Sequence, residues 1–277
     1  LLGSTNINSS ETKREQKEMV NMFFLSEDPK ESSRWLCDNH VVKMGLEAVQ
    51  VAWTVVRFVV EQSELDKLIT KYNQKNPQTG GAMKASHMKH PLVLWAGASA
   101  SQLEVVLQHA NAIFEEYSRR YHNREHVRHC DAKFLLQHGL SGWEGKAKHV
   151  GWCNEMRVWI ESGKSTTMSV TWWNTFSTAS FPPPIVPKEF LVPGADGNED
   201  EEEDEEEDEE EDDKKDEEKE KKTAASKEKT IESYRRYYEA KAMSMKVPMR
   251  YATPNSMIPH WFSAETRKKL KLKLKSN

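Results

Sequence analysis

The sequence has few cysteines and no long apolar run. Its three cysteines, Cys37, Cys130 and Cys153, include no Cys-x-x-Cys pair, which argues against a disulfide scaffold and against a zinc site with four thiolates. The longest strongly apolar stretch, Val49 to Val60, is about half of the roughly 20 residues that a membrane helix needs, and Arg57 interrupts it. We therefore expect an intracellular protein of a reducing compartment, without a membrane partner.

The sequence also lacks the signatures of common cofactor sites. It has no Gly-rich phosphate-binding loop and no specific signal for a Ser/His/Asp triad or a Cys/His pair. Three histidines and a cysteine, His122, His126, His129 and Cys130, have a spacing that could bring metal ligands onto one helical face. Arginines interleaved with them would repel a cation and suit phosphate better. We expect no bound metal and no small-molecule cofactor.

Charge is distributed very unevenly along the chain. The formal net charge is −4, yet residues 199–222 contain 19 acidic residues and 5 lysines. The rest of the chain then carries 35 basic and 25 acidic residues, a charge of +10. A cationic body is typical of proteins that bind polyanions. Nucleic acid is the expected partner, and a nuclear or virus-associated location is compatible with it.

The acidic run has two interpretations. Acidic residues stand unbroken from Glu199 to Asp213, and their repulsion and lack of apolar surface predict a disordered segment. It could be a simple spacer inserted in a surface loop. Alternatively, it could mimic DNA and occupy the cationic groove, an effect that salt would weaken.

The hydrophobic pattern predicts a mainly α fold, a compact single-domain helical bundle with long loops and a disordered acidic insertion. Apolar residues recur at spacings of three and four from Trp35 to Gln62 and again from Leu92 to Tyr121, the period of long buried helices. Shorter helices are predicted at Glu64–Tyr72, Lys133–His138, Asn154–Glu161 and Thr230–Lys246. The expected segments are a disordered leader at 1–19, a helical core at 20–192, an acidic linker at 193–230, a C-terminal helix and aromatic segment at 231–262, and a basic tail at 263–277.

A polar stripe follows the first long helix. His40, Lys43 and Glu47 fall at steps of three and four residues, so they share one face of an otherwise apolar helix. This face could simply be solvated, with a Lys43–Glu47 pair worth a few tenths of a kcal/mol. It could instead line a cleft in which Glu47 acts as a general acid or base beside His40 and Lys43.

Three segments carry a resemblance to a known family. Asp38 to Glu47, read as Asp-Asn-His-Val-Val-Lys-Met-Gly-Leu-Glu, resembles the first-helix segment of the endonuclease V type pyrimidine-dimer DNA glycosylases, which places an Asp, a His and the catalytic Glu at these relative positions. The segment from His90-Pro91 to Tyr121 is similar to that family's second long helix. The segment Tyr234–Ala242 is similar to its aromatic, basic C-terminal part. The same signals also resemble a group of uncharacterised phage and virus proteins.

The resemblance implies a DNA N-glycosylase that flips out a damaged or modified pyrimidine, cleaves its glycosidic bond and has an associated lyase activity. Glu47 would be the catalytic carboxylate, with His40 and Lys43 beside it. Family members use the free α-amine of their N-terminal residue as the nucleophile, and Val20 aligns with that residue. Because an internal Val20 nitrogen is an amide, the leader would have to be removed, or Lys43 would have to substitute, or imine chemistry would be absent.

The predicted DNA contacts are basic residues in three parts of the chain. One group precedes a helix N-terminus, where anions are favoured, a second forms an arginine strip, and a third lies in the aromatic C-terminal segment. Leu46 and Gln50 stand where the family has DNA-gripping arginines, so the lesion recognised could differ. The predicted contacts are Lys84, Lys89, His90, Arg119, Arg120, Arg124, Arg128, Arg235, Arg236 and Lys241.

Two other functions fit the same sequence. One is a noncatalytic DNA- or RNA-binding protein that uses the arginine strip and the Lys-rich tail. The other is an enzyme of viral modified-nucleotide metabolism. Tryptophans in the second half of the chain, including Trp143, Trp159 and Trp173, would stack on an extruded base in a DNA-acting enzyme, although core positions are the simpler expectation for most of them.

Overall fold

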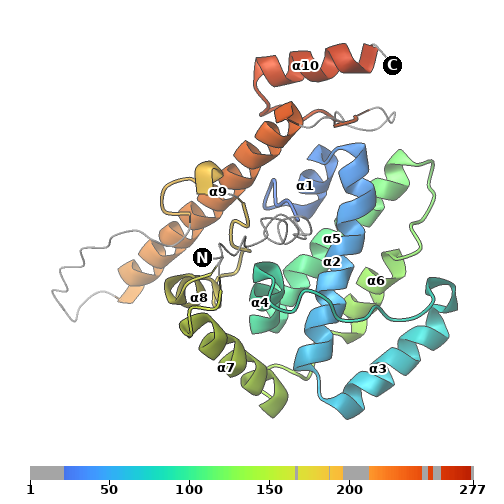
Figure 1. Cartoon of the computed structure of the whole chain (residues 1–277), viewed down its shortest axis with the longest axis vertical. Helices are drawn as coiled ribbons and strands as arrows, with labels where there is room; N and C mark the ends of the chain where they lie inside the picture. Colours follow the sequence, from blue (N-terminus) through green and yellow to red (C-terminus); the bar gives the residue numbers. More distant parts are fainter. Residues whose placement is uncertain are drawn as a thin grey trace, which may run out of the picture.

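The computed structural model describes residues 22–165, 168–186, 188–195, 212–244, 249–251 and 257–275, with the backbone alone described at 188, 212–221 and 271–275. Within these ranges the chain forms helices and no strand, which confirms the prediction of a mainly α, compact fold (Figure 1). The α-helices are α1 (Pro29–Trp35), α2 (Asp38–Val59), α3 (Gln62–Lys75), α4 (Pro91–Ala98), α5 (Ala100–Arg120), α6 (His129–His138), α7 (Ala147–Glu161), α8 (Val170–Phe176), α9 (Asp212–Ser244) and α10 (Ala264–Lys275). Short 3-10 turns lie at η2 (Pro77–Thr79) and η3 (Lys188–Phe190). No helix in the described ranges is both long enough and apolar enough to cross a membrane.

The centre of the fold is the pair α2 and α5, with α1, α4 and α6 packed around it. A glycine lets the two helices approach closely, because a Cβ at Gly45 would lie 2.8 Å from Cε1 of Phe114. Trp53 of α2 is fully buried and donates its indole N–H to Oδ1 of Asp131 in α6 at 2.6 Å. The inner face of α2 is therefore committed to packing, as its apolar period predicted.

The second long helix is interrupted, which corrects the prediction of one helix over Leu92–Tyr121. Ser99 has an extended backbone (φ −151°, ψ 161°) and its hydroxyl accepts a hydrogen bond from the N–H of Gln102 at 3.2 Å, so it caps α5 and separates it from α4. A serine favours such a cap because its side chain satisfies a backbone donor that the helix leaves free. Apolar spacing continues through the break, which is why the pattern did not reveal it.

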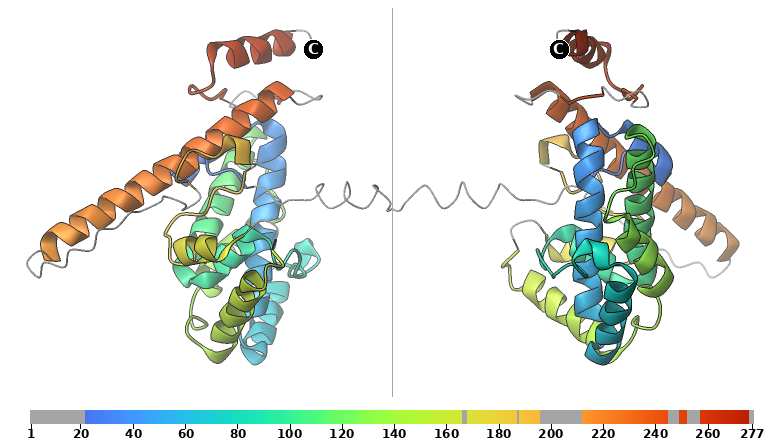
Figure 2. Two further views of the ribbon diagram at one scale, coloured as in Figure 1. Left: turned by 60° about the vertical axis from the view of Figure 1, so that its left-hand side comes forward. Right: turned by 90° about the vertical axis from the view of Figure 1, so that its right-hand side faces the viewer.

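Helix α9 begins far earlier than predicted. It starts at Asp212, inside the segment 193–230 that was expected to be disordered, while residues 196–211 of that segment lie outside the described residues. From Lys214 onward the sequence mixes lysines with its acidic residues and then adds alanines, a composition that favours a helix over the repulsion of an unbroken acidic run. The N-terminal part of α9 extends beyond the helical body (Figure 2).

The C-terminal half of α9 is anchored to the bundle by buried tyrosines. The hydroxyl of Tyr234 donates to the carbonyl of Pro183 at 2.9 Å and accepts from the N–H of Ile185 at 3.1 Å. The hydroxyl of Tyr238 accepts from the N–H of Cys37, the residue before α2, at 2.7 Å. These contacts bring a segment from the end of the chain against the start of α2.

The predicted basic tail is folded in part as α10. Its first turn is held by Glu239 of α9, whose Oε1 accepts from the N–H of Ser263 and from the hydroxyl of Thr266, both at 2.7 Å. Burial opposes ionisation of Glu239, but the hydrogen bonds from Ser263 and Thr266 outweigh it and lower the pKa of the carboxyl. Lys269 then donates to the carbonyl of Met243 at 2.8 Å. Helix α10 is thus docked at the C-terminal end of α9.

Candidate active site

The candidate site lies where the polar stripe of α2 meets the C-terminal half of α9. Lys43 and Glu47, one helical turn apart on α2, form an ion pair with 2.7 Å between Nζ and Oε1. The two side chains differ greatly in exposure, since 64% of Lys43 but only 15% of Glu47 is accessible. The carboxylate is therefore recessed beneath a lysine that remains in water.

The second carboxylate oxygen of Glu47, Oε2, makes no hydrogen bond that would stabilise the fold within the described residues. Its Oε2 is buried, and no described residue forms a hydrogen bond with it. Nearly all buried polar atoms in folded proteins have partners, and an exception requires an explanation. An oxygen that is kept free while its neighbour is held by Lys43 is well placed to accept a proton or to face positive charge on a ligand.

His40 contributes to the site as a neutral ring. It is 7% exposed, and burial together with the charges of Lys241 and Lys43 lowers the pKa of its imidazole to about 3. Its Nδ1 lies 3.0 Å from the hydroxyl of Tyr238. Because that hydroxyl already accepts from Cys37, its own proton is free to be donated to Nδ1. His40 therefore ties α2 to α9 and adds no charge near neutral pH.

Lys241 of α9 is the fourth member of the group formed by His40, Lys43 and Glu47. It was predicted to contact DNA phosphates, but its Nζ lies 5.2 Å from the ring centre of Phe23 and 5.6 Å from that of Tyr237. Burial and the charge of Lys43 lower the pKa of this amine, while the carboxylate of Glu47 acts in the opposite direction. Lys241 thus stands within electrostatic range of both members of the α2 ion pair.

The position of Lys241 could have been suspected from the local sequence alone. It follows Tyr237 by four residues and Tyr238 by three, so it occupies the face of α9 that the tyrosines bury. Its proximity to Glu47, however, depends on how α9 packs against α2, which no local pattern encodes. Val20, the other predicted nucleophile, lies outside the described residues.

The predicted arginine strip does not form a surface. The side chain of Arg120 is fully buried, with its guanidinium 3.0 Å from Oδ1 of Asp38, 2.6 Å from Oε1 of Glu116 and 2.7 Å from the carbonyl of Leu36. The prediction that Arg120 contacts DNA is therefore wrong, because all of its donors face the interior. Arg119 forms a bidentate pair with the same Glu116 at 2.6 Å for each contact and remains partly exposed.

The rest of the strip divides in the same way. Arg128 donates to the carbonyls of Gly81 and Thr79 at 2.8 and 2.9 Å, so it fixes a loop to the start of α6. Among the four arginines of the predicted strip, only Arg124 is fully on the surface. His126, which interleaves with them, stacks on Phe114 with 4.9 Å between ring centres. Most of the charged side chains of this strip therefore stabilise the fold through internal hydrogen bonds and ion pairs, and few are placed to contact a ligand.

Some of the other predicted DNA contacts have internal partners, whereas others are exposed. Arg235 donates to the carbonyl of Leu25 at 2.9 Å and lies over the rings of Trp35 and Trp261, at 5.0 and 5.6 Å from their centres. His90 is buried and caps α4 by accepting from the N–H of Leu92. By contrast, exposed positions suited to a surface contact are occupied by Lys84, Lys89 and Arg236.

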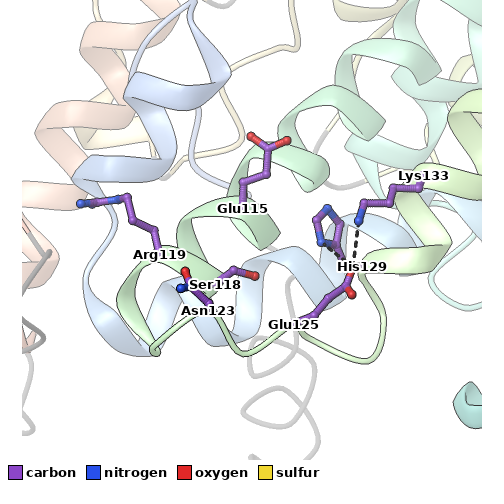
Figure 3. Close-up of a pocket in the computed structure, with 7 residues that line it drawn as sticks. All are labelled: Glu115, Ser118, Arg119, Asn123, Glu125, His129 and Lys133. Carbon is purple, nitrogen blue, oxygen red and sulfur yellow. Dashed lines mark hydrogen bonds and ion pairs between the residues drawn. The ribbon is translucent and has the colours of Figure 1, made fainter.

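A shallow pocket of about 450 Å³ lies apart from this group, at the end of α5 and the start of α6 (Figure 3). Within it Glu125 accepts from Lys133 at 2.8 Å and lies 3.3 Å from Nδ1 of His129. Burial and the charge of Lys133 lower the pKa of His129, so the ring is neutral near pH 7. The charged groups here neutralise one another. The lining residues are Glu115, Ser118, Arg119, Asn123, Glu125, His129 and Lys133.

The tryptophans are mostly core residues. Trp143 and Trp173 are 0% and 8% exposed, and the indole N–H of Trp143 donates to the carbonyl of Gly139 at 3.0 Å. Trp159 is partly exposed but lies beneath the amine of Lys89, 4.8 Å from its ring centre. Packing therefore accounts for most of these side chains, as the simpler expectation had it.

Comparisons of the chain with protein-family models, with curated proteins and with solved structures found no match. Function must therefore be inferred from the chemistry of the residues themselves. Of the clusters described, the one formed by Glu47, Lys43 and Lys241 combines a recessed carboxylate with an oxygen left without a described partner and a half-buried amine.

Proposed function

We propose that the protein is a DNA glycosylase that cleaves the N-glycosidic bond of a damaged or modified pyrimidine. The observation that carries the proposal is the recessed carboxylate of Glu47, whose Oε2 is buried and without a described partner, within electrostatic range of the half-buried amine of Lys241. Breaking a glycosidic bond generates positive charge on the sugar and requires a proton transfer, and a recessed carboxylate can serve both needs. The resemblance of Asp38–Glu47 to the pyrimidine-dimer glycosylases supports the same assignment.

DNA is supported as the partner by the charge around the site. Helix α10 is docked beside the C-terminal end of α9, and its residues Arg267 and Lys268 are exposed. The chain outside residues 199–222 carries a charge of +10. Exposed cations next to a recessed catalytic group suit a duplex whose phosphates lie outside while one nucleotide enters the recess.

The variant Glu47→Gln tests the proposal. It keeps the size and much of the hydrogen bonding of the side chain but removes its charge and its basicity. We expect base release to fall by about 10²–10⁴-fold, the usual contribution of a positioned acid or base, while DNA binding is retained. Base release is measured on duplex DNA irradiated with ultraviolet light and on duplexes carrying single modified pyrimidines.

A matched control is Glu155→Gln, since Glu155 is an exposed glutamate on α7. Its base release should equal that of the wild type. Equal rates for Glu47→Gln and the wild type would remove Glu47 from the mechanism. Binding to the duplexes without base release from any of them, in the wild type itself, would instead identify a noncatalytic DNA-binding protein.

A further inference from the structure

Lys241 is half-buried, and no carboxylate among the described residues forms an ion pair with it. No acceptor among the described residues contacts its Nζ, and its nearest described neighbours are the rings of Phe23 and Tyr237. Burying a cation without a partner is costly, and proteins avoid it unless the group has a use. Electrostatic attraction to a ring face offsets only part of that cost.

The groups around Lys241 favour its neutral form. On α2, the ammonium of Lys43 lowers the pKa of Lys241, as does burial, which is the larger effect. Glu47 on the same helix opposes these effects without reversing them. His40 is neutral, because its own pKa is about 3. A lysine made less basic by burial and by a neighbouring cation is a recognised form of amine nucleophile.

Lys43, the lysine that the sequence favoured as a substitute nucleophile, has the opposite environment. It is largely exposed, and its amine is held by the carboxylate of Glu47 at 2.7 Å. This contact ties the amine of Lys43 to Oε1 of Glu47, so the amine is not free to approach a sugar carbon. Lys43 instead fixes one oxygen of Glu47 and supplies the positive charge next to Lys241.

We propose that Lys241 is the nucleophile that attacks C1′ of the target deoxyribose, an inference that rests on the proposed glycosylase function. The lone pair of Nζ forms a bond to C1′, and the C1′–N bond to the base breaks, with the base leaving on its electron pair and taking a proton from solvent. One proton of the amine passes through a water molecule to Oε2 of Glu47 and from there to O4′ as the C1′–O4′ bond opens. The product is a protonated imine that joins Nζ to C1′ and retains the second amine proton.

This assignment gives both oxygens of Glu47 a task. Oε1 is fixed by Lys43, while Oε2, which has no described partner, is free to carry the proton. The imine is a covalent enzyme–DNA intermediate, and borohydride reagents reduce it to a stable secondary amine. Lyase activity would follow, because the imine activates the neighbouring C2′ protons for elimination of the 3′-phosphate.

The test is trapping on a duplex oligonucleotide that carries one abasic deoxyribose, in the presence of sodium cyanoborohydride, with the modified residue mapped by mass spectrometry. We expect the adduct on Lys241. Lys241→Arg keeps the charge but cannot form the imine, so the adduct should be lost while the melting temperature is unchanged. Lys43→Gln should lower the yield, because the positive charge beside Lys241 is lost, but should leave the adduct on Lys241. The matched control Lys67→Gln should keep the wild-type yield, since Lys67 is an exposed lysine of α3.

The two proposals can fail separately. An adduct on any other amine, or an equal yield from Lys241→Arg, would overturn the role of Lys241. Base release by the wild type without any adduct would also overturn it, and would leave a glycosylase in which Glu47 activates water. Absence of both base release and adduct would contradict the glycosylase function on which the inference rests.

Discussion

The recess of Glu47 beneath Lys43, within electrostatic range of Lys241, and the arginine cluster at the end of α5 both combine carboxylates with cations but use them differently. In the arginine cluster, the guanidinium of Arg120 donates hydrogen bonds to Asp38, to Glu116 and to backbone carbonyls. In the recess, Lys241 has no described acceptor, and one oxygen of Glu47 has no described donor. Both clusters contain charges of both signs. The candidate site differs from the structural cluster because some of its polar atoms lack described hydrogen-bond partners and can therefore contact a ligand.

The largest expected effect comes from breaking the scaffold cluster. Arg120→Met keeps much of the side-chain volume but leaves the buried carboxylates of Asp38 and Glu116 without their shared cation. We expect a loss of about 3–5 kcal/mol in the free energy of unfolding, the cost of removing one partner of a buried ion pair. Denaturant unfolding measures it.

Arg124→Met is the matched control, because Arg124 is exposed and should change stability by no more than about 0.5 kcal/mol. If Arg120→Met folded with wild-type stability and only lost affinity for DNA, the original assignment of Arg120 to the DNA surface would be restored. The contrast between the two clusters would then disappear.

The next largest expected effect is a dependence of the free energy of unfolding on pH, caused in part by the buried histidines His40 and His109. Burial lowers the pKa of His40 to about 3 and that of His109 to about 4. Unfolded histidines titrate near 6.5, so below that pH the unfolded state binds protons that the native state does not. Stability should therefore fall as the pH is lowered from 7 to 5, by up to about 1.4 kcal/mol per pH unit for each histidine.

Burial also lowers the pKa of His126, His129 and His138, so His40 and His109 supply part of this slope. Replacing His40 or His109 by Gln should flatten the plot of unfolding free energy against pH between 7 and 5. An unchanged slope in both variants would show that these rings are already solvated or protonated in the native protein.

The smallest effect on stability is expected at the rim of the recess. Lys43→Met removes an ion pair whose lysine is 64% exposed, and such surface pairs contribute between about 0.2 and 1 kcal/mol. The same variant removes a positive charge near Lys241, so it should raise the pKa of Lys241. A loss of several kcal/mol would instead mean that Lys43 belongs to the scaffold, like Arg120.

The sequence predicted the parts of this protein that depend on local spacing. The stripe of His40, Lys43 and Glu47 follows from the helical period, and α2 has it on one face as expected. The contact between His40 and Tyr238 spans 198 positions, and the pairing of Arg120 with Asp38 spans 82. Such contacts depend on the packing of whole helices, so periodicity could not show that Lys241 joins the site or that Arg120 leaves the surface.

The pKa of Lys241 tests the central claim most directly, because it requires no knowledge of the target base. Lysines can be reductively methylated with ¹³C and titrated by NMR, and the Lys241→Arg variant identifies the signal of Lys241. We predict that this signal titrates clearly below the value of about 10.4 typical of exposed lysines, and that it moves upward in Lys43→Met. A signal that titrates together with the exposed lysines would contradict the account.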